Sequence, residues 1–332
     1  MKRLAVAVLL AAVCALLLLT AAEYTKMRRE YKGIRIGNSE AVAGKIRTGL
    51  RHRAWKLHIT FRSHTKDDRD IKRIMDELLE QALQESDDPC GGDYIRCQLG
   101  GYRMHYDLKR SFLGYQCHME LMPTYYSTRE QEDYVDVQVE RILTNLAQKA
   151  EAGSDQSVQG RGARSGTEDR SETAGGTAYR SDAAGGTAEG AAEDAASAIS
   201  RLSEEQKIRL VHDYVTELLS YDSVHKDKEN SHGKVTAYAA LRYHQVVCQG
   251  YAVLTYRLLK EMGVHCRIET GDALIDGRKE RHAWLRVIVG GRELYMDPTL
   301  DDVNSCYDWF LKTADEFGKD HVIVRDPHSP EG

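Results

Sequence analysis

Cys248, His282 and Asp297 are residues whose types and positions suit nucleophilic chemistry. Cys248 opens an apolar stretch with helical periodicity, so we expect it at a helix N-terminus, where unpaired N–H groups and the helix dipole favour a thiolate. His282 should begin one strand and Asp297 should end the next, and a hairpin turn at Gly290 and Gly291 would bring the two side by side. An acid beside an imidazole fixes its tautomer and stabilises its charged form. Together the three would attack an acyl carbon.

Each of these residues also has an ordinary structural interpretation. A cysteine that opens an apolar helix is commonly a small buried residue, and Asp297 followed by Pro298 is a common turn sequence. The ordered occurrence of all three favours the catalytic interpretation. We expect the nearby Asp301 and Asp302 to be exposed loop residues, and Cys266, within a predicted strand, to be a core residue.

The sequence around these residues resembles that of the transglutaminase-like superfamily. The resemblance rests on three motifs in order, VCQGYAVL at 247–254, RHAWLRV at 281–287 and YMDPTLDD at 295–302. It extends over residues 203–326 and leaves the N-terminal part of the chain outside. The resemblance implies a papain-like α+β core in which Cys248 is the nucleophile, His282 the general base and acid, and Asp297 the orienting residue.

The chain departs from this family at two places. Members often carry Asn after His-Ala-Trp, where this chain has Leu285, and the second donor of the oxyanion hole, usually a side chain upstream of the cysteine, has no unique match. The backbone N–H of Cys248 is a candidate first donor, and Tyr221, His244 and Gln245 are candidates for the second. A weak second donor would make a slow enzyme.

The elements expected to position these residues follow from local patterns. Ser203 and Gln206 form a capping box before a helix, and residues 233–244 should form another. The helix that begins at Cys248 should end near Gly263, and short strands follow it. The fold class expected for this part is α+β, with the helix that bears the cysteine packed on an antiparallel sheet.

A second, smaller α+β domain is expected over residues 50–148. Its pattern reads strand, helix, strands, helix, with one apolar helix face formed by Ile71, Ile74, Met75, Leu78, Leu79, Ala82 and Leu83. A second face is formed by Val135, Val139, Ile142, Leu143 and Leu146. Nothing in this domain suits chemistry, so its role is unassigned. Residues 149–201, rich in Gly, Ala and Ser, should be a disordered linker, which leaves 202–327 as the transglutaminase-like domain.

The N-terminal residues 1–22 have the pattern of a signal anchor or a cleaved signal peptide. Lys2 and Arg3 precede an apolar run over residues 4–22, which is near the length needed to span a bilayer. We therefore expect a protein that is membrane-anchored through residues 4–22 with an extracytoplasmic domain, or secreted. The net charge of −5 provides no basic face, so nucleic acid is not an expected partner. No cysteine spacing matches a zinc site, and we expect neither metal nor cofactor.

Two functions remain open from the sequence. The first is an extracytoplasmic thiol acyl-transfer enzyme that acts on peptide or protein amides, including cell-wall peptides, through a Cys248 acyl-enzyme. Its acceptor would be an amine, as in a transglutaminase, or water, as in a protease or amidase. The alternative is a catalytically silent peptide-binding module at the cell surface. The sequence carries no indication of the oligomeric state.

Overall fold

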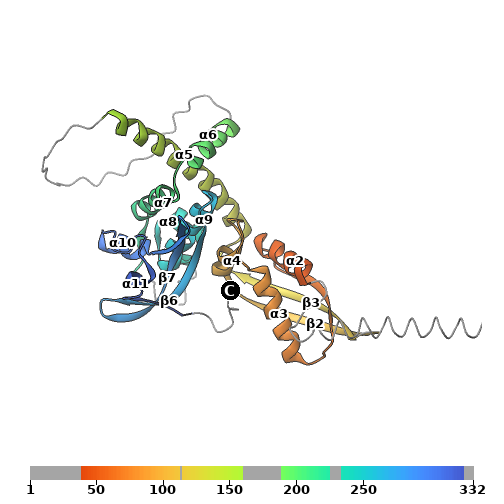
Figure 1. The fold of residues 1–332 in the computed structure, drawn as a ribbon. Coiled ribbons are helices and arrows are strands. Elements are labelled where there is room, and N and C mark those ends of the chain that lie inside the picture. Colours follow the sequence, from red (N-terminus) through yellow and green to blue (C-terminus); the bar gives the residue numbers. More distant parts are fainter. Residues whose placement is uncertain (1–38, 113, 160–187, 225–232, 325–332) are drawn as a thin grey trace, which may run out of the picture.

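The computed structural model describes residues 39–112, 114–159, 188–224 and 233–324. Figure 1 shows two units side by side, an N-terminal one in red to yellow and a C-terminal one in green to blue, with α4 (Gly92–Gln98) between them. The predicted signal segment, residues 1–22, lies outside the described residues. Within the described part of the chain, no helix combines the length and the apolar character that crossing a bilayer requires.

The described residues of the N-terminal unit form a three-stranded antiparallel sheet with helices packed on it. Its elements in chain order are α2 (Ser39–Arg51), β1 (Leu57–Ser63), α3 (Asp68–Ala82), α4, β2 (Leu99–Ser111) and β3 (Gly114–Tyr125). The strand order is β1-β3-β2, so β3 is central. β1 alternates buried and exposed residues as its sequence predicted, and Leu57, Ile59 and Phe61 share one core with α2 and α3.

The α3 helix confirms its predicted apolar face. All seven residues assigned to that face are buried, namely Ile71, Ile74, Met75, Leu78, Leu79, Ala82 and Leu83. Asp67 caps the helix, since its side chain accepts a hydrogen bond from the N–H of Arg69. In contrast, α2 lies mainly before the predicted start of the domain at residue 50, and its buried Ile46 and Leu50 belong to the same core.

The C-terminal unit is a layer of helices on an antiparallel sheet, as expected for the α+β class. Its elements after the linker region are α7 (Glu204–Leu218), β4 (Ser220–Tyr221), α8 (Ala237–Tyr243), β5 (Gln245–Val246), α9 (Cys248–Glu261), β6 (Cys266–Ile275), β7 (Arg278–Val289), β8 (Arg292–Met296), α10 (Pro298–Asn304), α11 (Ala314–Phe317) and β9 (His321–Ile323). The described strands of this sheet have the order β8-β7-β6-β9. The α9 helix packs on β6 and β7, and α7 and α8 pack on α9. The predicted fold class is therefore confirmed.

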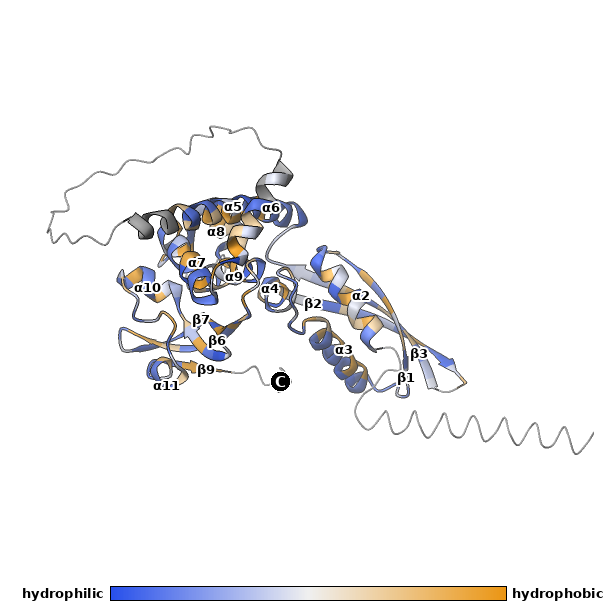
Figure 2. Ribbon diagram, turned by 45° about the horizontal axis from the view of Figure 1, so that its top comes forward, coloured by the Kyte–Doolittle hydropathy of each residue, from blue (hydrophilic) through white to orange (hydrophobic). Residues whose placement is uncertain are grey.

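Two helices occupy residues that the sequence assigned to the linker. The α5 helix spans Arg129–Gln159 and α6 spans Ala188–Ser200, so the predicted linker limits of 149–201 were too wide at both ends. The two helices lie side by side, and α5 also packs on α8 (Figures 1 and 2). Val139 and Ile142 of α5 and Ile199 of α6 share a core with α7, α8 and α9. The helix face predicted for α5 is thus buried against the C-terminal unit.

The short helix α4 links the hydrophobic cores of the two units. Its buried Tyr94 belongs to the C-terminal core, and the adjacent Ile95 belongs to the N-terminal core. Beside it, the buried carboxylate of Asp93 accepts hydrogen bonds from the Arg267 guanidinium at 2.7 and 3.1 Å and from the N–H of Ile268 at 3.0 Å. These contacts fasten the N-terminal unit to β6.

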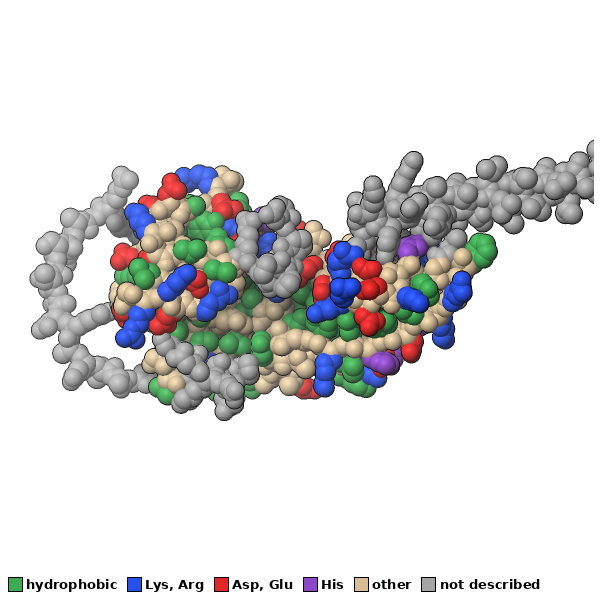
Figure 3. Space-filling view, turned by 90° about the horizontal axis from the view of Figure 1, so that it is seen from below, with side chains coloured by type: hydrophobic (Ala, Val, Ile, Leu, Met, Phe, Trp, Pro, Cys, Tyr) green, Lys and Arg blue, Asp and Glu red, His purple; other side chains and the backbone are tan. Residues whose placement is uncertain are grey.

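Lysine, arginine and acidic side chains are interspersed on the face of the molecule drawn in Figure 3. A further ion pair joins the two units. The ammonium of Lys260, at the end of α9, is buried and lies 2.8 Å from the carboxylate of Glu85. The Glu85 carboxylate also accepts a hydrogen bond from the Tyr256 hydroxyl at 2.8 Å. Removing Glu85 would leave the Lys260 charge buried without this partner, which is a costly arrangement.

Candidate active site

Cys248 is the first residue of α9, where the sequence placed it. Its side chain is partly exposed, whereas the helix is buried from Gly250 to Lys260. The preceding residue, Val247, provides no side-chain cap, and its carbonyl oxygen accepts a hydrogen bond from the N–H of Gly250 at 2.8 Å. The N–H groups of Cys248 and Gln249 therefore lie at the uncapped end of the helix. This is the environment in which a helix terminus favours an anionic sulfur or an oxyanion.

Gly250 in the VCQGYAVL motif has a packing reason. A Cβ atom at this position would lie 2.6 Å from Val246 Cβ and 2.8 Å from the carbonyl oxygen of Lys234. The first turn of α9 can therefore approach β5 this closely only with glycine at position 250. The helix ends as predicted, at Glu261 with Gly263 just beyond it in the left-handed region at φ +74°.

His282 and Asp297 are brought together by the predicted hairpin. Val289 of β7 pairs with Arg292 of β8, and the two residues between them, Gly290 and Gly291, have φ values of +56° and +74°. Such a two-residue turn requires positive φ, which glycine adopts without strain. His282 lies on β7, and Asp297 directly follows β8.

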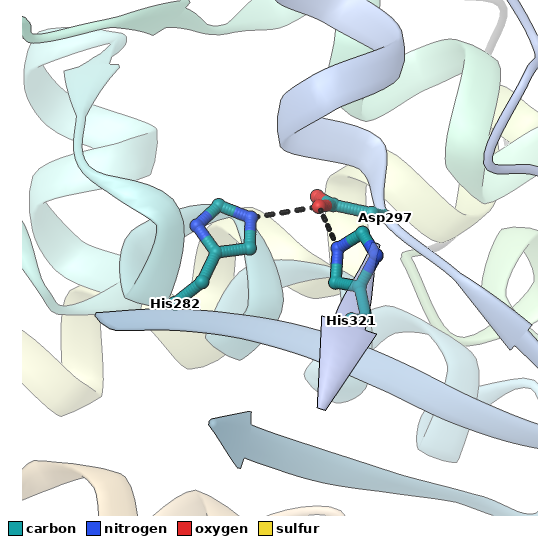
Figure 4. Close-up of side chains that lie close together, drawn as sticks. All are labelled: His282, Asp297 and His321. Carbon is teal, nitrogen blue, oxygen red and sulfur yellow. Dashed lines mark hydrogen bonds and ion pairs between the residues drawn. The ribbon is translucent and has the colours of Figure 1, made fainter. Parts of the chain in front are cut away.

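The two side chains form a short, buried hydrogen bond. His282 Nε2 lies 2.7 Å from Asp297 Oδ2, and the residues are 5% and 0% exposed. Figure 4 shows that the other ring nitrogen, Nδ1, points away from Asp297. Cys248 lies close enough to the same imidazole to contribute to its raised pKa. The structure thus places all three predicted residues in one region.

Asp297 has a second function as the cap of a helix. Its Oδ1 accepts hydrogen bonds from the N–H groups of Thr299 at 2.9 Å and Leu300 at 3.2 Å, and Pro298 occupies the first turn of α10. One oxygen of the carboxylate therefore caps α10 while the other faces imidazole. The Asp-Pro sequence, which alone suggests a turn, here fixes the orientation of the carboxylate.

His321 is part of the same cluster and was not predicted. Its Nε2 lies 3.2 Å from Asp297 Oδ2, the oxygen that also bonds His282. The contact depends on the antiparallel pairing of β9 with β6, in which His321 lies opposite Ala273. No motif around His321 signals this role, because its partner is 24 residues away in the sequence.

The surroundings change the ionisation of both members of the pair. Burial lowers the pKa of His282, but the charge and hydrogen bond of Asp297, together with Cys248, outweigh burial and hold that pKa well above its ordinary value. Burial raises the pKa of Asp297, but its two imidazole partners outweigh this and hold it well below the usual range for a carboxyl. The raised pKa of His282 and the lowered pKa of Asp297 both favour an imidazolium paired with a carboxylate.

A metal site is a different use of the same atoms. His282, Asp297 and His321 each offer a ligand atom, and these atoms lie within 4.8 Å of one another. However, the Nε2 atoms of His282 and His321 both lie at hydrogen-bond distance from the same oxygen, Asp297 Oδ2. We therefore treat the cluster as a hydrogen-bonded set and assign no metal ligand.

The candidate donors for the oxyanion hole lie on the segments that lead into Cys248. His244 and Gln245 are both exposed, and His244 ends α8 in the left-handed conformation. Tyr221 is half-buried, and β4 pairs with β5 so that Tyr221 lies opposite Val246. Its hydroxyl also acts on the pKa of Tyr251, one helical turn after Cys248. Of the three predicted candidates, Tyr221 is the one in contact with the core beside α9.

The expectation that Asp301 is exposed was wrong. Asp301 is 1% exposed, and its Oδ2 lies 3.0 Å from Nε2 of the equally buried His212. This second buried histidine–aspartate pair connects α7 to α10. Asp302 is half-buried, and its Oδ2 accepts a hydrogen bond from the Tyr251 hydroxyl at 2.5 Å. Both residues were misassigned because α10, which the Asp297 cap initiates, was read as a loop.

The other described cysteines are free thiols, and most are unfavourably placed for ionisation. Burial raises the pKa of Cys90 to about 11 and those of Cys97 and Cys117 to about 12. Cys266 is buried in the core as predicted, and burial raises its pKa further still. At neutral pH these four thiols stay protonated and react slowly with alkylating reagents.

The comparison with protein families supports a cysteine enzyme of a known class. Residues 193–298 match the model of the transglutaminase-like superfamily, and this range contains Cys248, His282 and Asp297. A transglutaminase-like superfamily domain in the C-terminal unit is thus supported, in agreement with the resemblance of its motifs. No curated protein matches the chain.

Three solved structures are similar to the chain. A crystal structure described as a TGase has a TM-score of 0.30 and 16% identity, with 74% of this chain and 50% of that chain covered. A presumed cysteine protease from Cytophaga hutchinsonii has a TM-score of 0.27 and 10% identity, with 60% and 65% covered. A presumed protease from Parabacteroides distasonis has a TM-score of 0.22 and 11% identity, with 60% and 37% covered. The similarity spans less than two thirds of each of these proteins.

Proposed function

We propose that the protein is an extracytoplasmic thiol acyl-transfer enzyme that acts on peptide or protein amides through an acyl-enzyme on Cys248. The observation that carries the proposal is the buried 2.7 Å hydrogen bond between His282 and Asp297, with Cys248 close enough to the same imidazole to contribute to its raised pKa. A thiol at a helix N-terminus beside an oriented imidazole is the arrangement that activates cysteine as a nucleophile.

In the first step the Cys248 sulfur attacks the carbonyl carbon of an amide. Its proton passes to His282, and the carbonyl oxygen becomes an oxyanion that the backbone N–H of Cys248 is positioned to bind. When the C–N bond breaks, His282 gives its proton to the leaving amine, which leaves a thioester on Cys248. Asp297 keeps the imidazole oriented and stabilises its charged form throughout.

In the second step an acceptor attacks the thioester. His282 removes a proton from the acceptor as it attacks, and the sulfur leaves and recovers a proton from the imidazolium. A primary amine as acceptor gives a new amide, as in transamidation, whereas water gives a carboxylate, as in a protease or amidase. Cys248, His282 and Asp297 serve both outcomes equally, because the acceptor enters only after the acyl-enzyme has formed.

We place the catalytic unit outside the cytoplasm because of the apolar residues 4–22, which follow Lys2 and Arg3. Cell-wall peptides and surface proteins are then the proposed substrates. Membrane fractionation of the full chain, with N-terminal sequencing of the product, distinguishes an anchor from a cleaved signal. Recovery of the intact chain from the cytoplasmic fraction would contradict this placement.

The experiment that tests the function uses a glutamine-containing protein and a labelled primary amine. The full chain and its Cys248→Ala and His282→Ala variants are incubated with both, and label incorporation and peptide fragments are followed together. Incorporation without fragments identifies a transglutaminase, and fragments without incorporation identify a protease. We expect the activity of both variants to be at least about 1,000-fold lower than that of wild type.

A matched control is available in the same unit. Cys306 is another partly exposed cysteine, but its Sγ lies 3.7 Å from the Asp301 carboxylate and not beside an imidazole at a helix start. Cys306→Ala should keep full activity. A Cys248→Ala variant as active as the Cys306→Ala control would refute the catalytic reading, and a peptide that binds without reaction would favour the binding module.

A further inference from the structure

His321 is held between two carboxylates deep in the C-terminal unit. Its side chain is buried, its Nε2 lies 3.2 Å from Asp297 Oδ2, and its Nδ1 lies 2.6 Å from Asp320 Oδ1. The Asp320 carboxylate is itself positioned by the indole N–H of Trp309, at 3.0 Å from Oδ2. A continuous chain of polar contacts thus runs from the molecular surface at Asp320 to the imidazole of His282.

Packing fixes the plane of the His321 ring. Phe317 stacks on it with ring centroids 4.0 Å apart, and Trp284 meets it edge-on at 5.0 Å. The strand that carries His321 approaches β6 so closely that a Cβ atom on Gly271 would lie 2.1 Å from the carbonyl oxygen of Val322. The ring therefore has little freedom to turn away from Asp297.

The contact with Asp297 completes the restraint of that carboxylate. Its Oδ1 is tied to two backbone N–H groups of α10, and its Oδ2 is shared by the two imidazoles (Figure 4). Without His321, only the reacting imidazole of His282 would hold Oδ2 in place. Oδ2 of Asp297 would then be held only by the imidazole that it has to orient, which is poor preorganisation for catalysis.

Hydrogen-bond geometry also indicates the charge of His321. Both ring nitrogens face carboxylate oxygens, and both contacts are donated at once only by the doubly protonated imidazolium. A cation at this position favours an ionised Asp297 within a buried site, and the lowered pKa of Asp297 has a hydrogen bond and charge from His321 among its causes. An ionised Asp297 is the form that stabilises the His282 imidazolium.

We infer that His321 is a positioning residue that holds Asp297 ionised and aligned with His282. It does not touch the reacting atoms and acts through Asp297, with Asp320 bonded to its other ring nitrogen. The inference rests on the proposed function, because it extends the set that activates Cys248. It adds a fourth and a fifth residue to a cluster in which the sequence motifs identify only three.

The test measures the alkylation rate of Cys248 by iodoacetamide in the full chain at about pH 6 and about pH 9. The rate at pH 6 divided by the rate at pH 9 reports how well the thiolate–imidazolium pair persists in acid, and circular dichroism at both pH values checks that each variant stays folded. We expect His321→Ala to lower this ratio about tenfold, the effect of losing one charge-assisted hydrogen bond. His321→Gln keeps a donor near Asp297 without the charge and should lower it less, by about threefold.

Two further variants keep the test decisive if His321→Ala fails to fold. Asp320→Asn alters a partly exposed side chain, so it should fold normally and lower the ratio by an intermediate amount. His212→Gln is the matched control, because His212 is an equally buried histidine bonded to a buried aspartate, Asp301, at 3.0 Å. It should lower the melting temperature and leave the ratio unchanged.

The outcomes separate this inference from the proposed function. A high ratio in wild type that persists in His321→Ala, His321→Gln and Asp320→Asn would overturn the positioning role alone. A wild-type Cys248 that reacts in acid as slowly as an ordinary thiol would overturn both. A high wild-type ratio that falls in the His321 variants, without acyl transfer in the amine assay, would support His321 and contradict the proposed reaction.

Discussion

Gln249 Nε2 donates a hydrogen bond to the carbonyl oxygen of Cys97 at 2.5 Å, so the residue beside the candidate nucleophile is bonded to α4 of the N-terminal unit. The sequence suggested that the two units are joined only by a linker. Instead, α4 contacts α9 and β6 directly, and α5 and α6 complete the core around α9. The N-terminal unit is part of the scaffold of the site.

A fragment of residues 201–332 should therefore be much less stable than a fragment of residues 129–332. The longer fragment keeps the buried side chains of α5 and α6, and each large apolar side chain contributes about 1.5–3 kcal/mol when fully buried. Thermal unfolding followed by circular dichroism compares the two. Equal melting temperatures would show that α5 adds nothing to the C-terminal core.

Asp297→Asn should fold and lose activity. Asparagine is as good a helix cap as aspartate, so the hydrogen bonds to Thr299 and Leu300 survive, but the amide stabilises the His282 imidazolium less and favours a different tautomer. We expect a loss of turnover roughly 100-fold smaller than the loss in Cys248→Ala. Turnover in the amine assay and the melting temperature are measured together. A variant that unfolds at room temperature would show that the charge is needed for the fold itself.

The His282–Asp297 pair should make stability depend on pH in a defined direction. Because the folded-state pKa of His282 is raised, its contribution is fully present below the ordinary histidine value of about 6.5 and is lost as pH rises toward the folded value. Because the pKa of Asp297 is lowered, its contribution is present above about 4 and is lost as pH falls through the folded value.

Urea unfolding of wild type and His282→Gln at several pH values checks this prediction. The difference in the free energy of unfolding should be largest between about pH 4.5 and 6 and should shrink above about pH 6.5. A difference that grows with rising pH would mean that His282 is buried in the neutral form.

Gly271→Ala should displace β9 and with it His321. The added Cβ would lie 2.1 Å from the carbonyl oxygen of Val322 and 2.7 Å from the Trp284 ring, so backbone must move. We expect a loss of about 1–3 kcal/mol in the free energy of unfolding, with slower alkylation of Cys248 in acid. Gly44→Ala is the control, because Gly44 lies in α2 with nothing within 4 Å of the added atom. It should be neutral or stabilising by up to about 1 kcal/mol.

The parts of the site that were predictable carry local signals. The start of α9 and the Gly290–Gly291 turn are each determined by a few adjacent residues, and their combination places Cys248, His282 and Asp297 in one region. His321 lacks such a signal, because its contact with Asp297 exists only after β9 has paired with β6.

The assignment of α5 shows a second limit of local patterns. The apolar face of Val135, Val139 and Ile142 predicts that this helix is buried on one side, but the pattern does not contain the identity of the covering surface. Proximity in the sequence favoured the N-terminal sheet, whereas the helix packs on α8 of the C-terminal unit. The length of α5 was underestimated for the same reason, since the residues after 148 carry few large apolar side chains.

The two carboxylate oxygens of Asp297 couple the folding of α10 to the activation of Cys248. Because Oδ1 caps α10 and Oδ2 bonds both imidazoles, unravelling of the first turn of α10 releases the acid and disorganises the nucleophile in a single event. A chain that is still folding or that has begun to open would thus carry an unactivated thiol. Loss of Cys248 reactivity should then precede the main unfolding transition on heating, and Cys248 would be activated only after folding is complete.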